Sequence, residues 1–287
     1  MGSDSKYTII NYPTLKNRKV ACLTLDVEQD YGDLLEIPSY EGLEHISELV
    51  NFFKERGVPL TCFVQGSLFE THSDKIKQLV ELDAEFELHS YSHPGPKQMN
   101  TEFQVKKGKE TYQRFFGSNP LGYRAPLGFI NDGDYEIMAS QGFKFDSSIF
   151  PSLRPGTFNN LRMPTKPYIL NGSGIVELPL TVFSNSIRIP IALSYIKILE
   201  KPYLYSLKYF SLPNLIVFDF HLHDLFELSS SSRIRLGGST IIYPWIFRRI
   251  YQNSRSGLDI FDKFITILQR KGYSFQKLID VYEAISK

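Results

Sequence analysis

Apolar strand-like runs alternate with helical patterns along most of this 287-residue chain, and this alternation limits the fold more than any other feature. The runs typical of strands lie at 20–25, 60–64, 86–89, 122–125, 143–146, 176–180 and 215–221. The last of them is almost wholly apolar, as strands buried on both faces of a parallel sheet are. Strands that alternate with helices predict parallel strands covered by helices, so the expected fold class is α/β.

The helical segments are predicted from apolar residues that recur every three to four positions. Gly57 and Gly142 supply natural stops for two of them. Thr101 and Gln104 have the spacing of a capping box at the start of another. The predicted helices cover 42–56, a short stretch from Ser73, 101–116, 131–141, 189–210, and two closing segments around 258–268 and 278–282. Because no internal repeat or low-complexity linker interrupts this pattern, residues 1–287 are predicted to form one domain.

The charge balance and hydropathy of the chain argue against some classes of binding partner. The 32 Lys and Arg residues nearly cancel the 31 Asp and Glu residues, so no strong field favours nucleic acid or an anionic membrane surface. No uncharged apolar run reaches the roughly 18 residues of a membrane span. The N-terminus lacks the apolar core of a secretory signal, which predicts a cytoplasmic protein. Cys22 and Cys62 lie in strand-like runs and are predicted to be small buried hydrophobes.

Candidate metal ligands follow two of the predicted strands. Asp26 and Glu28 come directly after the first apolar run and, two residues apart, would project from one face of a continuing strand. One carboxylate could bind a metal ion while the other acts as a base, and Asp30 is a rival for the metal-binding role. His89 and His93, four residues apart, could chelate a divalent ion from one face of a helical turn.

Two further groups stand at the ends of later strands. His221 and His223 close the most apolar strand, where a histidine is a good general-acid candidate because its pKa is easily tuned near neutrality. The two histidines share strand parity, so geometry alone does not choose between them. Arg124, which precedes the rigid Pro126, could pair with a catalytic carboxylate and keep it ionised.

Taken in order, these segments resemble the polysaccharide deacetylase family, also called the NodB-homology carbohydrate esterases. The order is Asp-Val-Glu at 26–28, His-Ser-Tyr-Ser-His at 89–93, Arg-Ala-Pro at 124–126 and a late strand that ends in His221. The first motif is similar to that of a subgroup with Asp-Val-Glu in place of the usual Asp-Asp pair. The resemblance covers roughly residues 18–285 and implies a distorted (β/α) barrel with about seven strands.

The resemblance also implies a role for each matching position. His89 and His93 would bind one divalent metal ion, zinc in most members, with Glu28 as the third ligand because Val27 stands where the family has its metal-binding Asp. Asp26 matches the catalytic base, Arg124 would tether it, and His221 would be the general acid. Within the same motifs, Tyr91 and Pro126 are assigned to substrate binding.

The activity implied is hydrolysis of the N-acetyl group of an amino sugar, carried by a polysaccharide, an oligosaccharide or a soluble or lipid-linked carrier. One alternative is hydrolysis of another C–N amide bond, such as a cyclic amide in a small metabolite. Another is a sugar-binding module that keeps the fold without the reaction. The aromatic stretch 187–212 is expected to pack against the barrel; the alternatives are that it lines a substrate groove, contacts lipid or forms a homo-oligomer interface.

Overall fold

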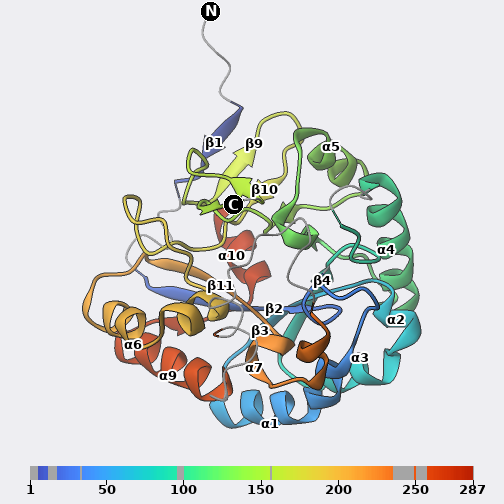
Figure 1. Ribbon diagram of the computed structural model, residues 1–287. Helices are drawn as coiled ribbons and strands as arrows, with labels where there is room; N and C mark the ends of the chain where they lie inside the picture. Colours follow the sequence, from blue (N-terminus) through green and yellow to red (C-terminus); the bar gives the residue numbers. More distant parts are fainter. Residues whose placement is uncertain are drawn as a thin grey trace, which may run out of the picture.

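The structure is a computed structural model of the chain. It describes residues 6–11, 18–32, 34–95, 100–155, 157–234, 249 and 257–286. Within these ranges a single large sheet forms the centre of the molecule, and helices surround it (Figure 1). The predicted α/β class is confirmed.

Seven neighbouring strands of this sheet run parallel, in the order β11-β2-β3-β4-β5-β6-β10. They are β2 (Val20–Val27), β3 (Leu60–Val64), β4 (Ala84–Leu88), β5 (Gly122–Tyr123), β6 (Phe145–Asp146), β10 (Val176–Glu177) and β11 (Leu215–His221). After β10, Thr181 donates its backbone N–H to the carbonyl oxygen of Val217 in β11 over 3.0 Å, which draws the two ends of the row together. This arrangement is the distorted (β/α) barrel that the sequence predicted.

The other described strands lie outside this row. Next to β10 the sheet continues antiparallel through β9 (Tyr168–Leu170) and β1 (Tyr7–Ile9), and β12 (Ser274–Phe275) pairs with β2. A separate hairpin is made of β7 (Leu153–Arg154) and β8 (Phe158–Asn159).

Most of the predicted helices are present. The longer ones are α1 (Ile46–Arg56), α4 (Thr101–Phe116), α5 (Asp132–Ser140), α6 (Leu193–Tyr209), α9 (Gly257–Arg270) and α10 (Leu278–Ile285). The shorter ones are η2 (Glu41–His45), α2 (Leu68–Thr71), α3 (Ser73–Leu79), η4 (Pro126–Gly128), α7 (Leu222–Leu225) and η5 (Ser229–Arg233). Among the described helices, none is both long and apolar enough to cross a membrane.

The helix predicted over 189–210 differs from the observed one. α6 begins only at Leu193, and its backbone breaks at Glu200, where φ is 49°. Pro202 explains the break, because a proline inside a helix has no N–H to donate and its ring clashes with the preceding turn. Residues 229–240 are rich in Ser, Arg and Gly, a composition that predicts a loop. The structure has the 3-10 helix η5 at Ser229–Arg233, and residues 235–240 lie outside the described residues.

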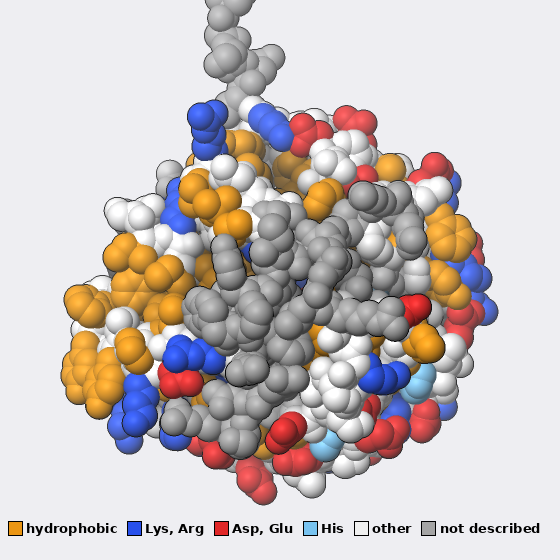
Figure 2. Space-filling model, in the orientation of Figure 1, with side chains coloured by type: hydrophobic (Ala, Val, Ile, Leu, Met, Phe, Trp, Pro, Cys, Tyr) orange, Lys and Arg blue, Asp and Glu red, His pale blue; other side chains and the backbone are white. Residues whose placement is uncertain are grey.

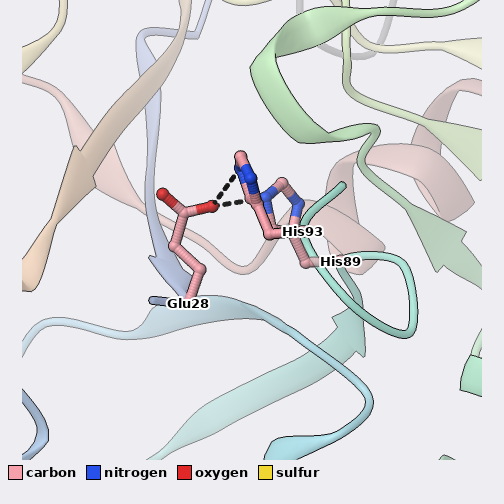
Figure 3. A group of neighbouring side chains, drawn as sticks. All are labelled: Glu28, His89 and His93. Carbon is pink, nitrogen blue, oxygen red and sulfur yellow. Dashed lines mark hydrogen bonds and ion pairs between the residues drawn. The ribbon is translucent and has the colours of Figure 1, made fainter. Parts of the chain in front are cut away.

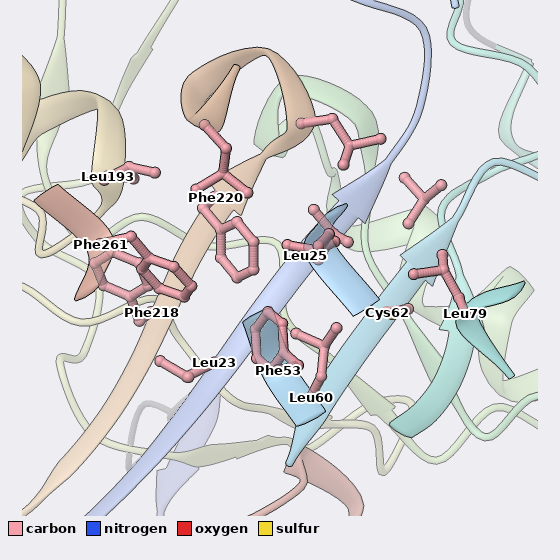
Figure 4. Close-up of a cluster of buried hydrophobic side chains, with 14 of the residues drawn as sticks. Leu23, Leu25, Phe53, Leu60, Cys62, Leu79, Leu193, Phe218, Phe220 and Phe261 are labelled. Carbon is pink, nitrogen blue, oxygen red and sulfur yellow. The ribbon is translucent and has the colours of Figure 1, made fainter. Parts of the chain in front are cut away.

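The two faces of each barrel strand have different neighbours, because side chains alternate along a strand. Outward-facing Leu23 and Leu25 of β2 pack with Phe53 of α1, beside the stacked rings of Phe218 and Phe261 (Figure 4). Fully burying one such side chain contributes roughly 1.5–3 kcal/mol. This layer fixes the helices against the barrel wall.

The barrel interior changes from apolar to polar along the strands. At the N-terminal end, Val20 and Cys22 of β2 pack in one cluster with Leu278 and Val281 of α10, and Phe63 extends this cluster toward the site. Both cysteines are free and buried, as predicted, and burial raises the pKa of each thiol. Further along β2, the inward positions become polar, and this change directs the functional groups to the open end of the barrel.

Candidate active site

The sequence-predicted groups meet at the C-terminal end of the barrel. Asp26 of β2 lies opposite His221 in the parallel register of β2 and β11. Glu28, His89 and Arg124 each follow within a residue of the ends of β2, β4 and β5. They line a cavity of about 100 Å³ together with His93, Ala125, Leu127, Gly128, Ser148, Phe150, Arg154, Phe158, Ser194, Tyr195 and Asp219.

Glu28, His89 and His93 form a compact group that could hold a metal ion (Figure 3). The Glu28 Oε2 atom lies 2.9 Å from Nε2 of His89 and 2.9 Å from Nε2 of His93. All three residues are buried. Although burial raises the pKa of a carboxyl group, the neighbouring imidazole of His93 and the hydrogen bonds from both histidines lower the pKa of Glu28 well below its usual value.

The orientation of His89 fits a metal ligand. Its Nδ1 atom lies 2.9 Å from the backbone carbonyl oxygen of Arg124, which can only accept a hydrogen bond. A neutral His89 imidazole would therefore keep its proton on Nδ1, which would leave the lone pair of Nε2 available to a metal ion in place of the hydrogen bond to Glu28. Two imidazole nitrogens with a carboxylate oxygen are a donor set that catalytic zinc sites use.

Asp30, the rival third ligand, is engaged elsewhere. Its Oδ2 accepts the backbone N–H of Glu41 at 2.8 Å, and its Oδ1 accepts that of Gly42 at 3.1 Å. Asp30 thus satisfies the first N–H groups of η2 instead of joining Glu28. The geometry favours Glu28 as the ligand.

A buried ion-pair network holds Asp26. Nη1 of Arg124 donates to Asp26 Oδ1 at 2.7 Å and to Asp219 Oδ1 at 3.0 Å. The guanidinium carbon of Arg124 lies 4.1 Å from the centre of the Phe63 ring, so a cation–π contact adds to the ion pairs that hold Arg124. The second oxygen of Asp26, Oδ2, lies 4.0 Å from Nε2 of His89 and 3.8 Å from Nε2 of His221. One oxygen is therefore fixed, and the other faces the cavity.

The choice between His221 and His223 follows from the end of β11. The strand stops at His221 and α7 begins at Leu222, so the two rings do not share a strand face. His223 accepts the backbone N–H of Tyr31 at its Nδ1 over 3.1 Å, away from the cavity lining. Burial and the neighbouring His221 lower the pKa of His223 to about 4.

His221 is oriented by a carboxylate that the sequence reading did not single out. Its Nδ1 atom lies 3.0 Å from Asp224 Oδ2, and its Nε2 atom lies 3.7 Å from Glu28 Oε1. Burial alone would lower the pKa of this imidazole, but the charge of Asp219 and the hydrogen bond to Asp224 raise it well above the usual value. The pairing has the opposite effect on Asp224, lowering its pKa to about 2 despite burial.

The loop that carries the two histidines is held by Gln104. Its Oε1 accepts the backbone N–H groups of Tyr91 at 3.1 Å and Ser92 at 2.8 Å, and the Ser90 hydroxyl at 2.8 Å. The capping box predicted for Thr101 and Gln104 is therefore wrong, because the side chain that caps α4 is that of Asn100.

Neither predicted substrate-binding residue is among those that line the cavity. The hydroxyl of Tyr91 donates to Glu70 Oε2 at 3.1 Å, at an exposed position. Pro126 is buried at the start of η4, while its neighbours Ala125 and Leu127 reach the cavity. The sequence did not predict a functional role for Asp219, Asp224, Gln104 or the lining residue Arg154. Only Asp219 carried a usable signal, because it is a charged residue inside an otherwise apolar strand.

Comparison with known proteins shows which family the N-terminal half of the chain is similar to. Residues 16–145 match the family model for polysaccharide deacetylase. Over 124 residues the chain is 30% identical to a peptidoglycan deacetylase from Helicobacter pylori, a match that covers 42% of each protein. Over 115 residues it is 27% identical to the peptidoglycan deacetylase-like protein FGM2 of Gibberella zeae, covering 38% of this chain and 34% of that protein. The match spans less than half the length of either relative.

Solved structures share the fold over nearly the whole chain. A Mycobacterium smegmatis protein described as a polysaccharide deacetylase has a TM-score of 0.63 and 15% identity, covering 98% of this chain and 94% of that one. A peptidoglycan N-acetylglucosamine deacetylase has a TM-score of 0.55 and 18% identity, covering 96% and 91%. A CE4 family pseudoenzyme from Bacillus anthracis has a TM-score of 0.53 and 15% identity, covering 93% and 66%.

Such a pseudoenzyme is a reminder that function depends on the site and not on the fold. In this chain the motifs keep the order described above, and their side chains meet at one end of the barrel. Residues 16–145 match the polysaccharide deacetylase family model, the fold is shared with solved deacetylase structures, and the motifs keep their order; in all three respects this chain is similar to the polysaccharide deacetylase family.

Proposed function

We propose that this chain is a metal-dependent hydrolase that removes the N-acetyl group from an amino sugar. The observation that carries the proposal is the meeting, at one cavity, of a candidate metal-binding group, a tethered carboxylate and a carboxylate-paired histidine. Neither a cyclic amide hydrolase nor a binding module has a specific observation in its favour.

Glu28, His89 and His93 would hold one divalent ion, with zinc as the proposed metal. When bound there, the ion would supply Lewis-acid polarisation of an acyl oxygen and a lowered pKa for water. The chain's contribution is to present the three donor atoms together in a buried site, with His89 locked by the carbonyl oxygen of Arg124.

Asp26 is proposed as the general base. Arg124 holds its Oδ1, so Oδ2 keeps a fixed position from which it can take a proton from water during attack on the amide carbon. Proton transfer by a positioned side chain contributes about 10²–10⁴-fold to a rate.

His221 is proposed as the general acid. Its Nδ1 pairs with Asp224, so the proton to be donated resides on Nε2, on the side of Asp26 and Glu28. The leaving amine needs this proton, because an unprotonated amine is a poor leaving group.

The cavity wall suggests the substrate class. A cavity of about 100 Å³ suits an acetamido group, with the rest of the sugar outside. Arg154 of β7 lines this cavity, and within the described residues no ion pair joins it to a carboxylate. We therefore propose a substrate that carries an anionic group near the N-acetyl sugar.

Acetate release tests both parts of the proposal. The zinc-loaded protein is expected to release acetate, with an equal amount of free amine, from UDP-N-acetylglucosamine in preference to a neutral chitin tetramer. Arg154→Gln should lower kcat/KM for the phosphorylated substrate about 10-fold to 100-fold, since a charged hydrogen bond contributes roughly 1.5–3 kcal/mol.

The exposed Arg162 supplies the matched control. Arg162→Gln is expected to leave kcat/KM unchanged for both the phosphorylated and the neutral substrate. No acetate from any N-acetylated sugar would contradict the deacetylase assignment. Acetate release with no preference for the charged sugar would contradict only the role of Arg154.

A further inference from the structure

A groove of about 650 Å³ lies between α6 and α9, away from the catalytic cavity. Its floor is apolar and includes Leu204 and Ile267. Five cationic residues line it: Lys201, Lys208, Lys263, Arg270 and Lys271. None of the described residues that line it is acidic.

The positive charge of the groove is local. The whole chain has a formal net charge of only +1, so a general attraction to polyanions is not expected. Nevertheless five cations share one groove, and within the described part of the chain none of them is joined to a carboxylate in an ion pair. The near-zero net charge describes the chain as a whole, whereas the fold gathers these cations locally from two helices, α6 and α9.

Aromatic side chains are exposed at the rim of the same groove. Tyr205 and Tyr209 are 60% and 67% exposed, and their rings stack with centroids 6.0 Å apart. Phe210, at the end of α6, is 61% exposed. Lys208 lies beside them, with Nζ 5.0 Å from the centre of the Tyr209 ring. Figure 2 shows hydrophobic side chains gathered over α6 next to Lys and Arg side chains.

We propose that this groove docks the protein on the surface of an anionic phospholipid bilayer. Tyr rings are favoured at the level of lipid headgroups, and Lys side chains lay their alkyl stems along apolar surface while the ammonium group meets phosphate. Exposed aromatics between cations on an amphipathic helix are the arrangement that interfacial helices use. The apolar floor fits the glycerol and upper acyl region and gives nucleobases no polar partner.

The position of α6 connects this surface to the catalytic cavity. Ser194 and Tyr195, near the start of α6, line the cavity, whereas Tyr205 and Tyr209 line the groove. Docking through α6 would hold the cavity near the bilayer. The docking proposal itself does not depend on the proposed deacetylase activity.

Vesicle co-sedimentation of the full chain tests the proposal. The protein is expected to bind vesicles of phosphatidylcholine with roughly 30 mol% phosphatidylglycerol and to leave pure phosphatidylcholine vesicles unbound. A triple variant, Lys201→Gln, Lys208→Gln and Lys263→Gln, should bind the anionic vesicles about 100-fold more weakly, as expected if each lysine contributes about 5-fold. Binding should also fall as salt rises, because salt screens surface charge.

The control removes the same charge elsewhere, with Lys54→Gln, Lys77→Gln and Lys106→Gln at other exposed positions. It is expected to bind like the unmodified chain. Equal losses in the two triple variants, or no binding by the unmodified chain, would overturn the proposal. Complete displacement from vesicles by a soluble polyanion such as heparin would assign the groove to an anionic polymer and likewise overturn it. Acetate release from a soluble substrate by the groove variant is expected to be unchanged.

Discussion

Asp26→Asn is expected to lower kcat for acetate release by about 10²–10⁴-fold. Asparagine has the shape of aspartate and can still accept the hydrogen bond from Arg124 through its carbonyl oxygen, but its amide cannot take a proton from water. Affinity for zinc should change little, because Glu28 and the two histidines are intact. The measurement is kcat of the zinc-loaded variant alongside zinc affinity by competition with a chelator.

Asp30→Asn is the matched control for this change. Asp30 lies four residues further along the chain and accepts backbone N–H groups of η2, so its loss should affect stability and leave kcat nearly unchanged. Full activity of Asp26→Asn would remove Asp26 from the role of base. A large loss of kcat in both variants would instead indicate that the substitutions disturb the fold.

Arg124→Met is expected to destabilise the protein by about 3–5 kcal/mol, the range typical when one partner of a buried ion pair is removed. The substitution leaves Asp26 and Asp219 buried together without the cation that lies between them. Urea denaturation of the metal-free protein at neutral pH measures the loss. Arg114→Met removes an exposed arginine paired with Glu70 and should cost less than about 1 kcal/mol.

The loss caused by Arg124→Met should depend on pH. Burial and the charge of Asp26 already raise the pKa of Asp219 to about 7 in the native protein. A carboxyl group with a raised folded-state pKa favours the folded state at low pH, and this contribution is lost as pH rises through that pKa. Removing the cation strengthens the effect, so the destabilisation should be larger at pH 8 than at pH 5. A loss that is equal at both pH values would contradict this account of the network.

The strands of the barrel were largely predictable because each is a run of apolar residues bounded by turns. β3 and β11 have the predicted bounds, since both of their faces are buried. β5, β6 and β10 are only two residues long and so are shorter than the predicted runs at 122–125, 143–146 and 176–180. The break in α6 at Glu200 follows from Pro202. The helix was predicted from the spacing of apolar residues, which does not take a proline inside the helix into account.

The site was predictable in its residue types but not in its supporting contacts. The resemblance assigned Asp26, Glu28, His89, His93, Arg124 and His221, and the fold brings all of them to one cavity. Gln104 illustrates the limit of local reasoning. Its spacing from Thr101 fits a capping box, yet in the folded protein its side chain accepts hydrogen bonds from residues 90–92 instead. The contact between His221 and Asp224 forms because β11 ends at His221 and a helix follows. The alternation of side chains along a strand does not predict where the strand ends.

Zinc binding tests the central claim most directly. Metal-free protein titrated with zinc is expected to take up about one ion per chain with high affinity, and His89→Ala is expected to lose this site. His72→Ala, which changes a histidine outside the cavity, should bind like the unmodified chain. Absence of zinc uptake by the unmodified chain, or equal uptake by His89→Ala, would contradict the assignment of Glu28, His89 and His93 as the metal site.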